Sequence, residues 1–121
     1  MPFDISQHPD YFVLRLTGTL VGEDLENVAR AVQELEDAGP LLNRVTDLTG
    51  IELLNVAFPE VQTLADRRRS RHFARPVKSA LLAHKPLHIG YARMFQSLND
   101  NPFLQVRLVK SMDEALHWFS E

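Results

Sequence analysis

The chain has 121 residues, of which 45% are hydrophobic and 24% are charged, and its formal net charge is −3. These values are typical of one globular domain over residues 1–121, and they exclude a disordered chain and a strongly basic nucleic-acid-binding protein. Because the chain has no cysteine, disulfides, thiolate catalysis and cysteine-bound zinc are excluded as well.

The first third of the chain changes from a strand pattern to a helix pattern. Residues 1–10 contain no basic region followed by an apolar run, and no later run has the length of a membrane span, so we expect a cytoplasmic protein without a transmembrane segment. Residues 3–6 and 11–16 predict two strands, the second from its period of two. Residues 22–38 have apolar side chains at helical spacing and end at Gly39-Pro40, which predicts a helix.

Strands and helices alternate in the rest of the chain. A short run over residues 41–48, with Val45 inside it, predicts a buried strand, and a loop then leads to a helix that begins near Phe58. Ser111 and Glu114 have the spacing of a capping box and predict the start of the last helix. The remaining predicted elements are strands over residues 77–83 and 103–109 and a helix over residues 87–98. The predicted order is therefore ββαβαβαβα.

This order predicts an α/β domain with a mixed, mostly parallel sheet and flanking helices, because strands that alternate with helices are joined by right-handed crossovers. A second feature is the segment Arg44-Val45-Thr46-Asp47-Leu48-Thr49-Gly50-Ile51-Glu52-Leu53-Leu54-Asn55. This segment and the order of elements resemble the STAS superfamily and, more narrowly, its bacterial SpoIIAA-like branch. The resemblance covers nearly the whole chain. It implies a regulatory, protein-binding module similar to anti-sigma-factor antagonists, rather than an enzyme.

The resemblance also implies an interaction loop that contains Asp47, Thr49, Gly50 and Asn55. In the family's antagonists, a kinase phosphorylates a serine at the start of the helix after this loop. The equivalent positions here are Val56 and Ala57, which have no hydroxyl, so a switch that adds charge there is not available. We expect Asn55 to cap the helix and Asp47 to accept backbone hydrogen bonds. Thr49 is either a second phosphorylation site or a turn residue.

Basic residues follow the second predicted helix as a patch of five arginines: Arg67, Arg68, Arg69, Arg71 and Arg75. Cations there complement the negative end of the helix dipole, and they could also bind an anionic partner. Nucleic acid is disfavoured because the chain is acidic and few aromatic residues lie among the arginines. The acidic first helix offers an alternative, in which this helix of one copy binds the arginines of another. The identity of any other protein partner is not predicted.

Two further sites are conceivable from the sequence. His84, Lys85 and His88 follow a strand and could bind an anion at the carboxyl edge of the sheet, although they could also only shape a loop. We expect no metal site, because the histidines are scattered and Pro86 interrupts the closest pair. No motif indicates a cofactor or an enzymatic nucleophile.

Aromatic and apolar residues of the helices allow a second hypothesis, which is a carrier or sensor of a small apolar or amphipathic, lipid-like ligand. SpoIIAA-like domains are similar in outline to the lipid-carrying CRAL-TRIO domains. A pocket between sheet and helices could hold an acyl chain, although such residues more often form a core. The expected pocket residues are Phe58, Leu64, Tyr91, Met94, Phe95 and Trp118.

Overall fold

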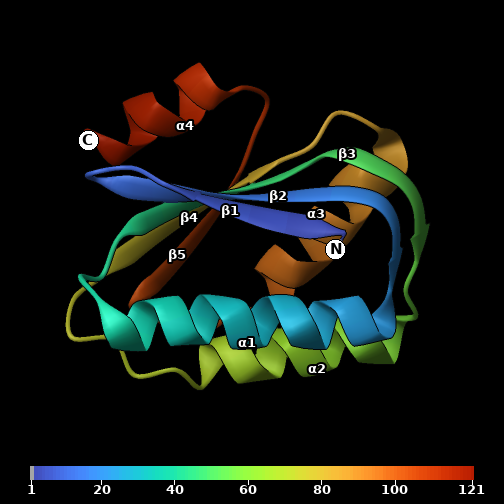
Figure 1. The fold of residues 1–121 in the computed structure, drawn as a ribbon, viewed down its shortest axis with the longest axis horizontal. Helices are drawn as coiled ribbons and strands as arrows, with labels where there is room; N and C mark the ends of the chain where they lie inside the picture. Colours follow the sequence, from blue (N-terminus) through green and yellow to red (C-terminus); the bar gives the residue numbers. More distant parts are fainter. Residues whose placement is uncertain (1) are drawn as a thin grey trace.

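Residues 2–121, which the computed structural model describes, form one α/β domain with a five-stranded sheet in the order β1-β2-β3-β4-β5 (Figure 1). Strands β1 and β2 pair antiparallel, and the other neighbouring strands pair parallel. The element order ββαβαβαβα and the mostly parallel sheet confirm the prediction. The elements are β1 (Phe3–Gln7), β2 (Tyr11–Val21), α1 (Gly22–Ala38), β3 (Asn43–Asn55), α2 (Phe58–Arg69), β4 (Val77–Leu82), α3 (Pro86–Leu98), β5 (Leu104–Val109) and α4 (Met112–Phe119).

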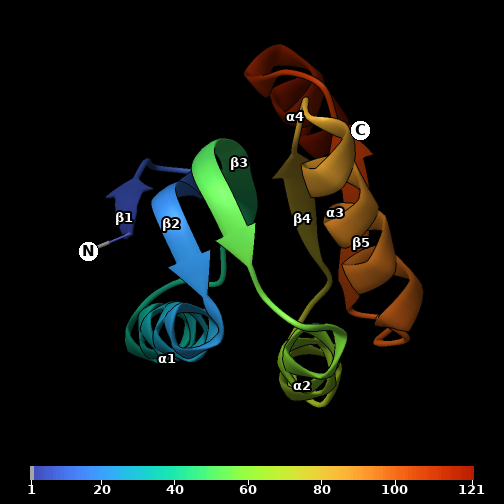
Figure 2. The ribbon, with the colours of Figure 1, turned by 90° about the vertical axis from the view of Figure 1, so that its right-hand side faces the viewer.

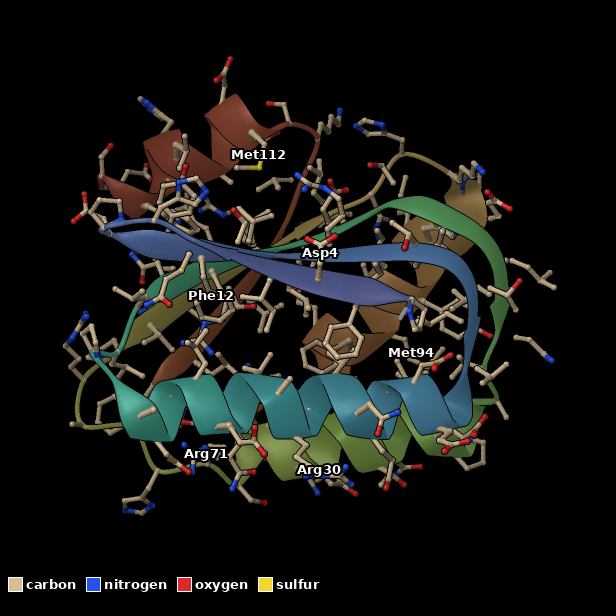
Figure 3. The ribbon with its side chains drawn as sticks, viewed as in Figure 1. Asp4, Phe12, Arg30, Arg71, Met94 and Met112 are labelled. Carbon is tan, nitrogen blue, oxygen red and sulfur yellow. The ribbon has the colours of Figure 1, made fainter. Side chains whose placement is uncertain are left out.

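The helices cover the two faces of the sheet unequally. Successive parallel strands are direct neighbours, and right-handed crossovers between them place α1, α2 and α3 on one face. Helix α4 follows the last strand and lies on the other face, while α1 and α2 run side by side (Figure 2). Phe12 on β2 accordingly points toward α1, and Met112 on α4 lies on the opposite side of the sheet (Figure 3). The fold therefore has a hydrophobic core on each face of the sheet.

The carboxyl ends of β2 and β3 are longer than predicted, because the segment expected to be a loop stays paired. Between the pairs Arg15–Asp47 and Thr17–Gly50, strand β3 contains one more residue than β2, and a second register shift follows Gly18. Such bulges increase the local twist of a strand pair. The two strands bend together toward α1 and α2 at this end (Figure 1). Thr49, Gly50 and Asn55 therefore lie in a bent strand, and the prediction of a loop after Leu48 is wrong.

Two glycines permit this bend. Gly18 has φ +69°, a left-handed conformation that glycine adopts without steric cost. A side chain on Gly50 would place its Cβ 2.9 Å from the Leu16 carbonyl oxygen, so the strands can approach this closely only with glycine there. Both residues mark irregular pairing rather than the end of a strand.

Helix starts follow local sequence signals, with one correction. The Ser111 Oγ accepts a hydrogen bond of 3.1 Å from the Glu114 amide, as the capping box predicts. Helix α2 instead begins after Ala57, whose amide donates to the Glu60 carboxylate at 2.8 Å. Asn55 lies in β3 and does not cap this helix, so that prediction is wrong. No helix within residues 2–121 combines the length and apolarity that crossing a membrane requires.

Candidate functional site

A set of large exposed apolar side chains lies at the carboxyl ends of the parallel strands, where β2 and β3 end and where α2 and α3 begin. It comprises Val21, Leu53, Phe58 and Leu87, whose exposed fractions are 36%, 57%, 52% and 56%. We call these four residues the apolar edge. Phe103, which is 45% exposed and precedes β5, belongs to a different part of the molecule. The apolar edge thus contains most of the large exposed apolar side chains among the described residues.

Pairing and one hydrogen bond hold the apolar edge together. Val21 pairs with Asn55, and Leu53 pairs with Thr19, so both lie on the bent end of β2 and β3. The Tyr91 hydroxyl on α3 donates to the Val56 carbonyl oxygen at 2.5 Å, which ties α3 to the connection before Phe58. Leu87 lies one helical turn before Tyr91. These elements are therefore fixed relative to one another.

The residues predicted to carry regulation lie near this surface. Val56 is buried and Ala57 is the residue before α2, so they occupy the helix start that the resemblance implies. The Asp47 Oδ1 accepts hydrogen bonds from the Thr49 amide at 2.9 Å and from the Thr49 hydroxyl at 2.6 Å. Arg15 lies 3.5 Å from the other Asp47 oxygen. Asp47 thus accepts a backbone hydrogen bond within the bulged part of β3, as expected.

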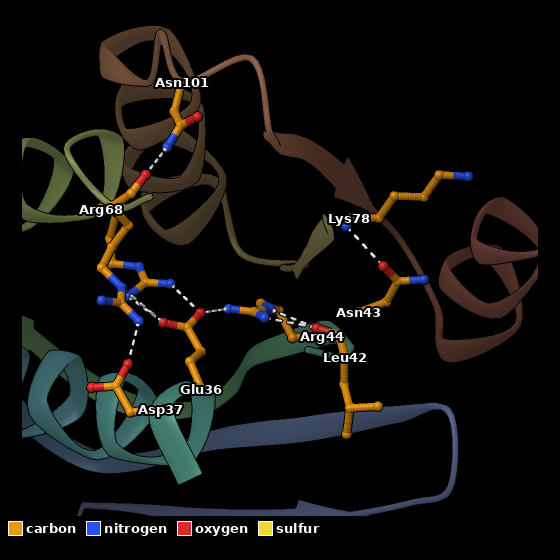
Figure 4. A network of polar contacts seen from close by, with 9 residues as sticks. Glu36, Asp37, Leu42, Asn43, Arg44, Arg68, Lys78 and Asn101 are labelled. Carbon is orange, nitrogen blue, oxygen red and sulfur yellow. Dashed lines mark hydrogen bonds and ion pairs between the residues drawn. The ribbon is translucent and has the colours of Figure 1, made fainter. Parts of the chain in front are cut away.

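A buried ion cluster joins the C-terminal end of α1 to β3 and α2 (Figure 4). The side chain of Glu36 is 2% exposed and binds Arg44 and Arg68, whose side chains are 5% and 9% exposed. Arg71 donates to Glu36 at 3.3 Å and to the exposed Asp37 at 2.8 Å. Arg44 also donates to the Leu42 carbonyl. The guanidinium carbons of all three arginines lie within 6.0 Å of the centre of the buried Phe73 ring.

Burial and the charges in this cluster together lower the pKa values of Glu36 and Arg44. Burial alone would raise the pKa of Glu36, but the hydrogen bonds and charges of Arg68 and Arg44 outweigh burial and hold the pKa below its ordinary value of 4.5. Burial lowers the pKa of Arg44, and the charges of Arg68 and Arg71 act in the same direction against the attraction of Glu36. The buried part of the cluster carries one carboxylate and two guanidinium groups, so positive charge is in excess there.

This cluster changes the interpretation of the arginine patch. Arg68 and Arg71 bind acids of α1 within the same chain, Arg69 pairs with Asp66 at 2.9 Å, and Arg75 donates to the Leu41 carbonyl. Arg67 lies in a groove between α1 and α2. Two of the five arginines, Arg68 and Arg71, are therefore paired with acids of α1 within one molecule. Arg69 and Arg75 remain exposed, and self-association through the acidic helix and the arginines stays a prediction.

The second candidate site is an apolar cavity of about 140 Å³ between the sheet and helices α1, α2 and α3. Of the predicted pocket residues, Leu64, Tyr91 and Phe95 line it. The structure does not bring Phe58, Met94 and Trp118 to the cavity. Phe58 is half exposed, and Trp118 packs against the opposite face of the sheet because α4 lies there. The sequence shows that these residues are apolar, but it does not specify which face of the sheet their helices cover.

The predicted anion site is divided between surface and interior. His84 and Lys85 are exposed, and His84 Nε2 lies 2.7 Å from the Lys110 carbonyl oxygen. His88 is 3% exposed, and its Nδ1 has no hydrogen-bond partner among residues 2–121. Burial lowers the pKa of His88, and the charge of Lys85 lowers it further. The structure therefore does not present the three residues together. Among residues 2–121, no group of three side chains that could hold a metal ion occurs.

Sequence reasoning missed Glu36 and Phe73, the two residues at the centre of the ion cluster. Both have ordinary local surroundings in the sequence, since Glu36 is one of several acids in α1 and Phe73 follows the arginine patch. A residual signal was Arg44, a charged residue beside Val45 in a strand that was expected to be buried. A buried arginine requires a counter-charge, and only the tertiary structure identifies it.

Comparisons with known proteins place this geometry in a known fold. No protein-family model matches the chain, and no curated protein matches it. Among solved structures, an uncharacterised protein of the DUF3478 family from Shewanella loihica, described as having a SpoIIAA-like fold, is similar over 96% of this chain and 90% of its own, with a TM-score of 0.61 and 15% identity. An anti-sigma factor antagonist from Mycobacterium paratuberculosis is similar over 98% and 93%, with a TM-score of 0.64 and 13% identity. The chain therefore has a SpoIIAA-like fold, as its resemblance to that branch implied.

Proposed function

We propose that this protein is a non-enzymatic regulatory module that binds a partner protein through the apolar edge. The observation that carries the proposal is that four large exposed apolar side chains lie at the carboxyl ends of the parallel strands. Single exposed apolar side chains are ordinary on a protein surface, whereas several at one end of a fold indicate a binding surface. The likeness in fold to a protein described as an anti-sigma factor antagonist supports a regulatory role.

Charges around the apolar edge favour a partner with basic residues. Glu23 follows Val21, Glu52 precedes Leu53, and Glu60 lies in the first turn of α2 after Phe58. All three glutamates are exposed. Protein interfaces commonly combine an apolar centre with a polar rim, and complementary charges on the rim mainly accelerate association.

Partner binding is expected to be lost when the apolar edge is made polar. A photo-crosslinking amino acid at position 53, introduced in the source cells, would capture the partner for identification by mass spectrometry. The double variant Leu53→Ser, Phe58→Ser should then bind the purified partner at least about tenfold more weakly in calorimetry, because a few residues at the centre of an interface carry most of its binding energy.

Phe103→Ser is the matched control, since Phe103 is similarly exposed but lies outside the apolar edge. It should retain the affinity of the unmodified protein. Equal affinities for the double variant and the control would reject the apolar edge as the binding surface. Crosslinking of the same partner from position 103 would contradict the proposal as well.

Regulation by phosphate at the start of α2 is not part of this function. Val56 and Ala57 carry no hydroxyl, the Thr49 hydroxyl is hydrogen-bonded to Asp47, and the Tyr91 hydroxyl is hydrogen-bonded to the Val56 carbonyl oxygen. We expect intact-mass and peptide spectra of the protein from its source cells to show no phosphate on residues 55–58. Phosphate found on this segment would overturn the expectation.

A further inference from the structure

The cavity under the sheet is large enough for a small molecule. It measures about 140 Å³, and its walls are mainly aliphatic and aromatic side chains such as Leu14, Val28 and Leu81. An apolar engineered cavity of about 150 Å³ in another protein stays free of water and binds benzene. A group of about six carbon atoms therefore fits the space.

One end of the cavity is charged. Arg44 and Arg68 both line it, although they are only 4% and 8% exposed to solvent. Ser79, the register partner of Arg44 on β4, lines the same end. Each guanidinium has five N–H donors, and the hydrogen bonds that Arg68 makes within residues 2–121 both go to Glu36. Donors therefore remain on Arg68 for a further acceptor.

The charge balance at this end favours an anion. Glu36 supplies one negative charge to two buried guanidinium groups, and the nearby Arg71 is offset by Asp37. A buried charge without a counter-ion is costly, so an added carboxylate would be stabilised by the excess positive charge. Carboxylates also match the fork of N–H donors on arginine.

A route to the cavity lies between α1 and α2. A surface groove of about 320 Å³ runs there, and Leu25, Ala29 and Leu64 line both the groove and the cavity. These three side chains therefore lie between the groove and the cavity. Small motions of the two helices could open this path, since motions of packed helices occur on microsecond to millisecond time scales.

We propose that the cavity binds a small apolar carboxylate, with its hydrocarbon part against Leu14, Val28 and Leu81 and its carboxylate against Arg68 and Arg44. This site is separate from the apolar edge, and it extends the proposed function by a ligand that the protein carries or senses. The occupant is defined by an apolar body of the cavity's size and one negative charge.

Hexanoate and hexan-1-ol are the matched probes, because they have the same number of carbon atoms and differ in charge. Calorimetry at pH 7 should show hexanoate binding at least about tenfold more tightly than hexan-1-ol, since only the carboxylate can pair with the arginines. Nuclear Overhauser effects should connect the hexanoate methylene protons with methyl groups of Val28 and Leu81. Equal affinities, no binding of either probe, or contacts only with surface methyl groups would each overturn the proposal.

A cavity-filling variant gives an independent test. Ala92 is 3% exposed and lines the cavity, so Ala92→Leu should occupy the space and abolish hexanoate binding. Ala92→Val, which adds less volume, should weaken binding if the leucine variant does not fold. The variant Leu53→Ser, Phe58→Ser should bind hexanoate normally, which separates failure of this proposal from failure of the proposed protein interaction. Unchanged hexanoate affinity in a folded Ala92 variant would exclude the cavity as the site.

Discussion

Replacing Glu36 with glutamine is expected to lower the free energy of unfolding at pH 7 by about 3 kcal/mol or more, the range seen when one partner of a buried ion pair is removed. The buried Arg44 and Arg68 would lose their shared counter-charge, while the new amide would place N–H donors against the guanidinium donors. The ends of α1 and α2 and the start of β3 meet at this point. Urea denaturation followed by circular dichroism measures the change.

The effect of Glu36→Gln should also depend on pH. The pKa of Glu36 is lowered in the folded protein, so its contribution to stability is complete above about 4.5 and is lost as the pH falls through the folded pKa. The difference between the two proteins should therefore shrink in acid. Glu34→Gln, on the exposed side of the same helix, is the control and should change stability little. A difference at pH 7 no larger than this control would contradict the structural role of Glu36.

Replacing Trp118 with alanine is expected to lower the free energy of unfolding by about 3 to 5 kcal/mol. Trp118 is 7% exposed and packs with Val45 and Val109 between α4 and the sheet. Its ring also lies beneath Arg107, at 4.9 Å from the guanidinium carbon. Helix α4 has only eight residues, too few to be stable without this packing.

The Trp118 variants also test which face of the sheet the residue covers. Phe103→Ala, at an exposed position, should change stability by no more than about 0.5 kcal/mol when measured by the same urea denaturation. The milder Trp118→Phe should remain folded and bind hexanoate with unchanged affinity, because the cavity lies on the other face. A stability change for Trp118→Ala as small as that of the control would contradict the described packing of α4.

The main features of the fold could be predicted because the apolar periods and the helix-end residues of each segment agree with the α/β arrangement of the whole domain. The helix expected over residues 22–38 matches α1, since apolar spacing, acids in the first turn and a Gly-Pro stop all indicate the same boundaries. Alternating strand and helix periods then imply a parallel sheet with right-handed crossovers. The expected fold is confirmed, although the two similar solved structures described above are only 15% and 13% identical to the chain.

The site could be predicted less well, and β3 gives the clearest reason. Gly50 and the polar residues near it resemble the end of a strand, because a glycine in a strand pattern often indicates a turn. In the structure, β2 follows β3 through two bulges, so backbone pairing continues to Asn55. The sequence of a segment does not show whether a partner strand stays within hydrogen-bonding distance of it. The pairing of β3 beyond Leu48 could therefore not be predicted.

The sequence by itself determined the number, type and order of the strands and helices, but not the extended ends of β2 and β3, since element type depends on the period of nearby apolar residues. Only the tertiary structure decided that Glu36 meets Arg44 and Arg68, that Trp118 lies apart from the cavity, and that four apolar side chains share one edge. These relations join residues that are distant in the chain. The physical reason is that burial and charge pairing depend on three-dimensional neighbours, which the local pattern does not specify.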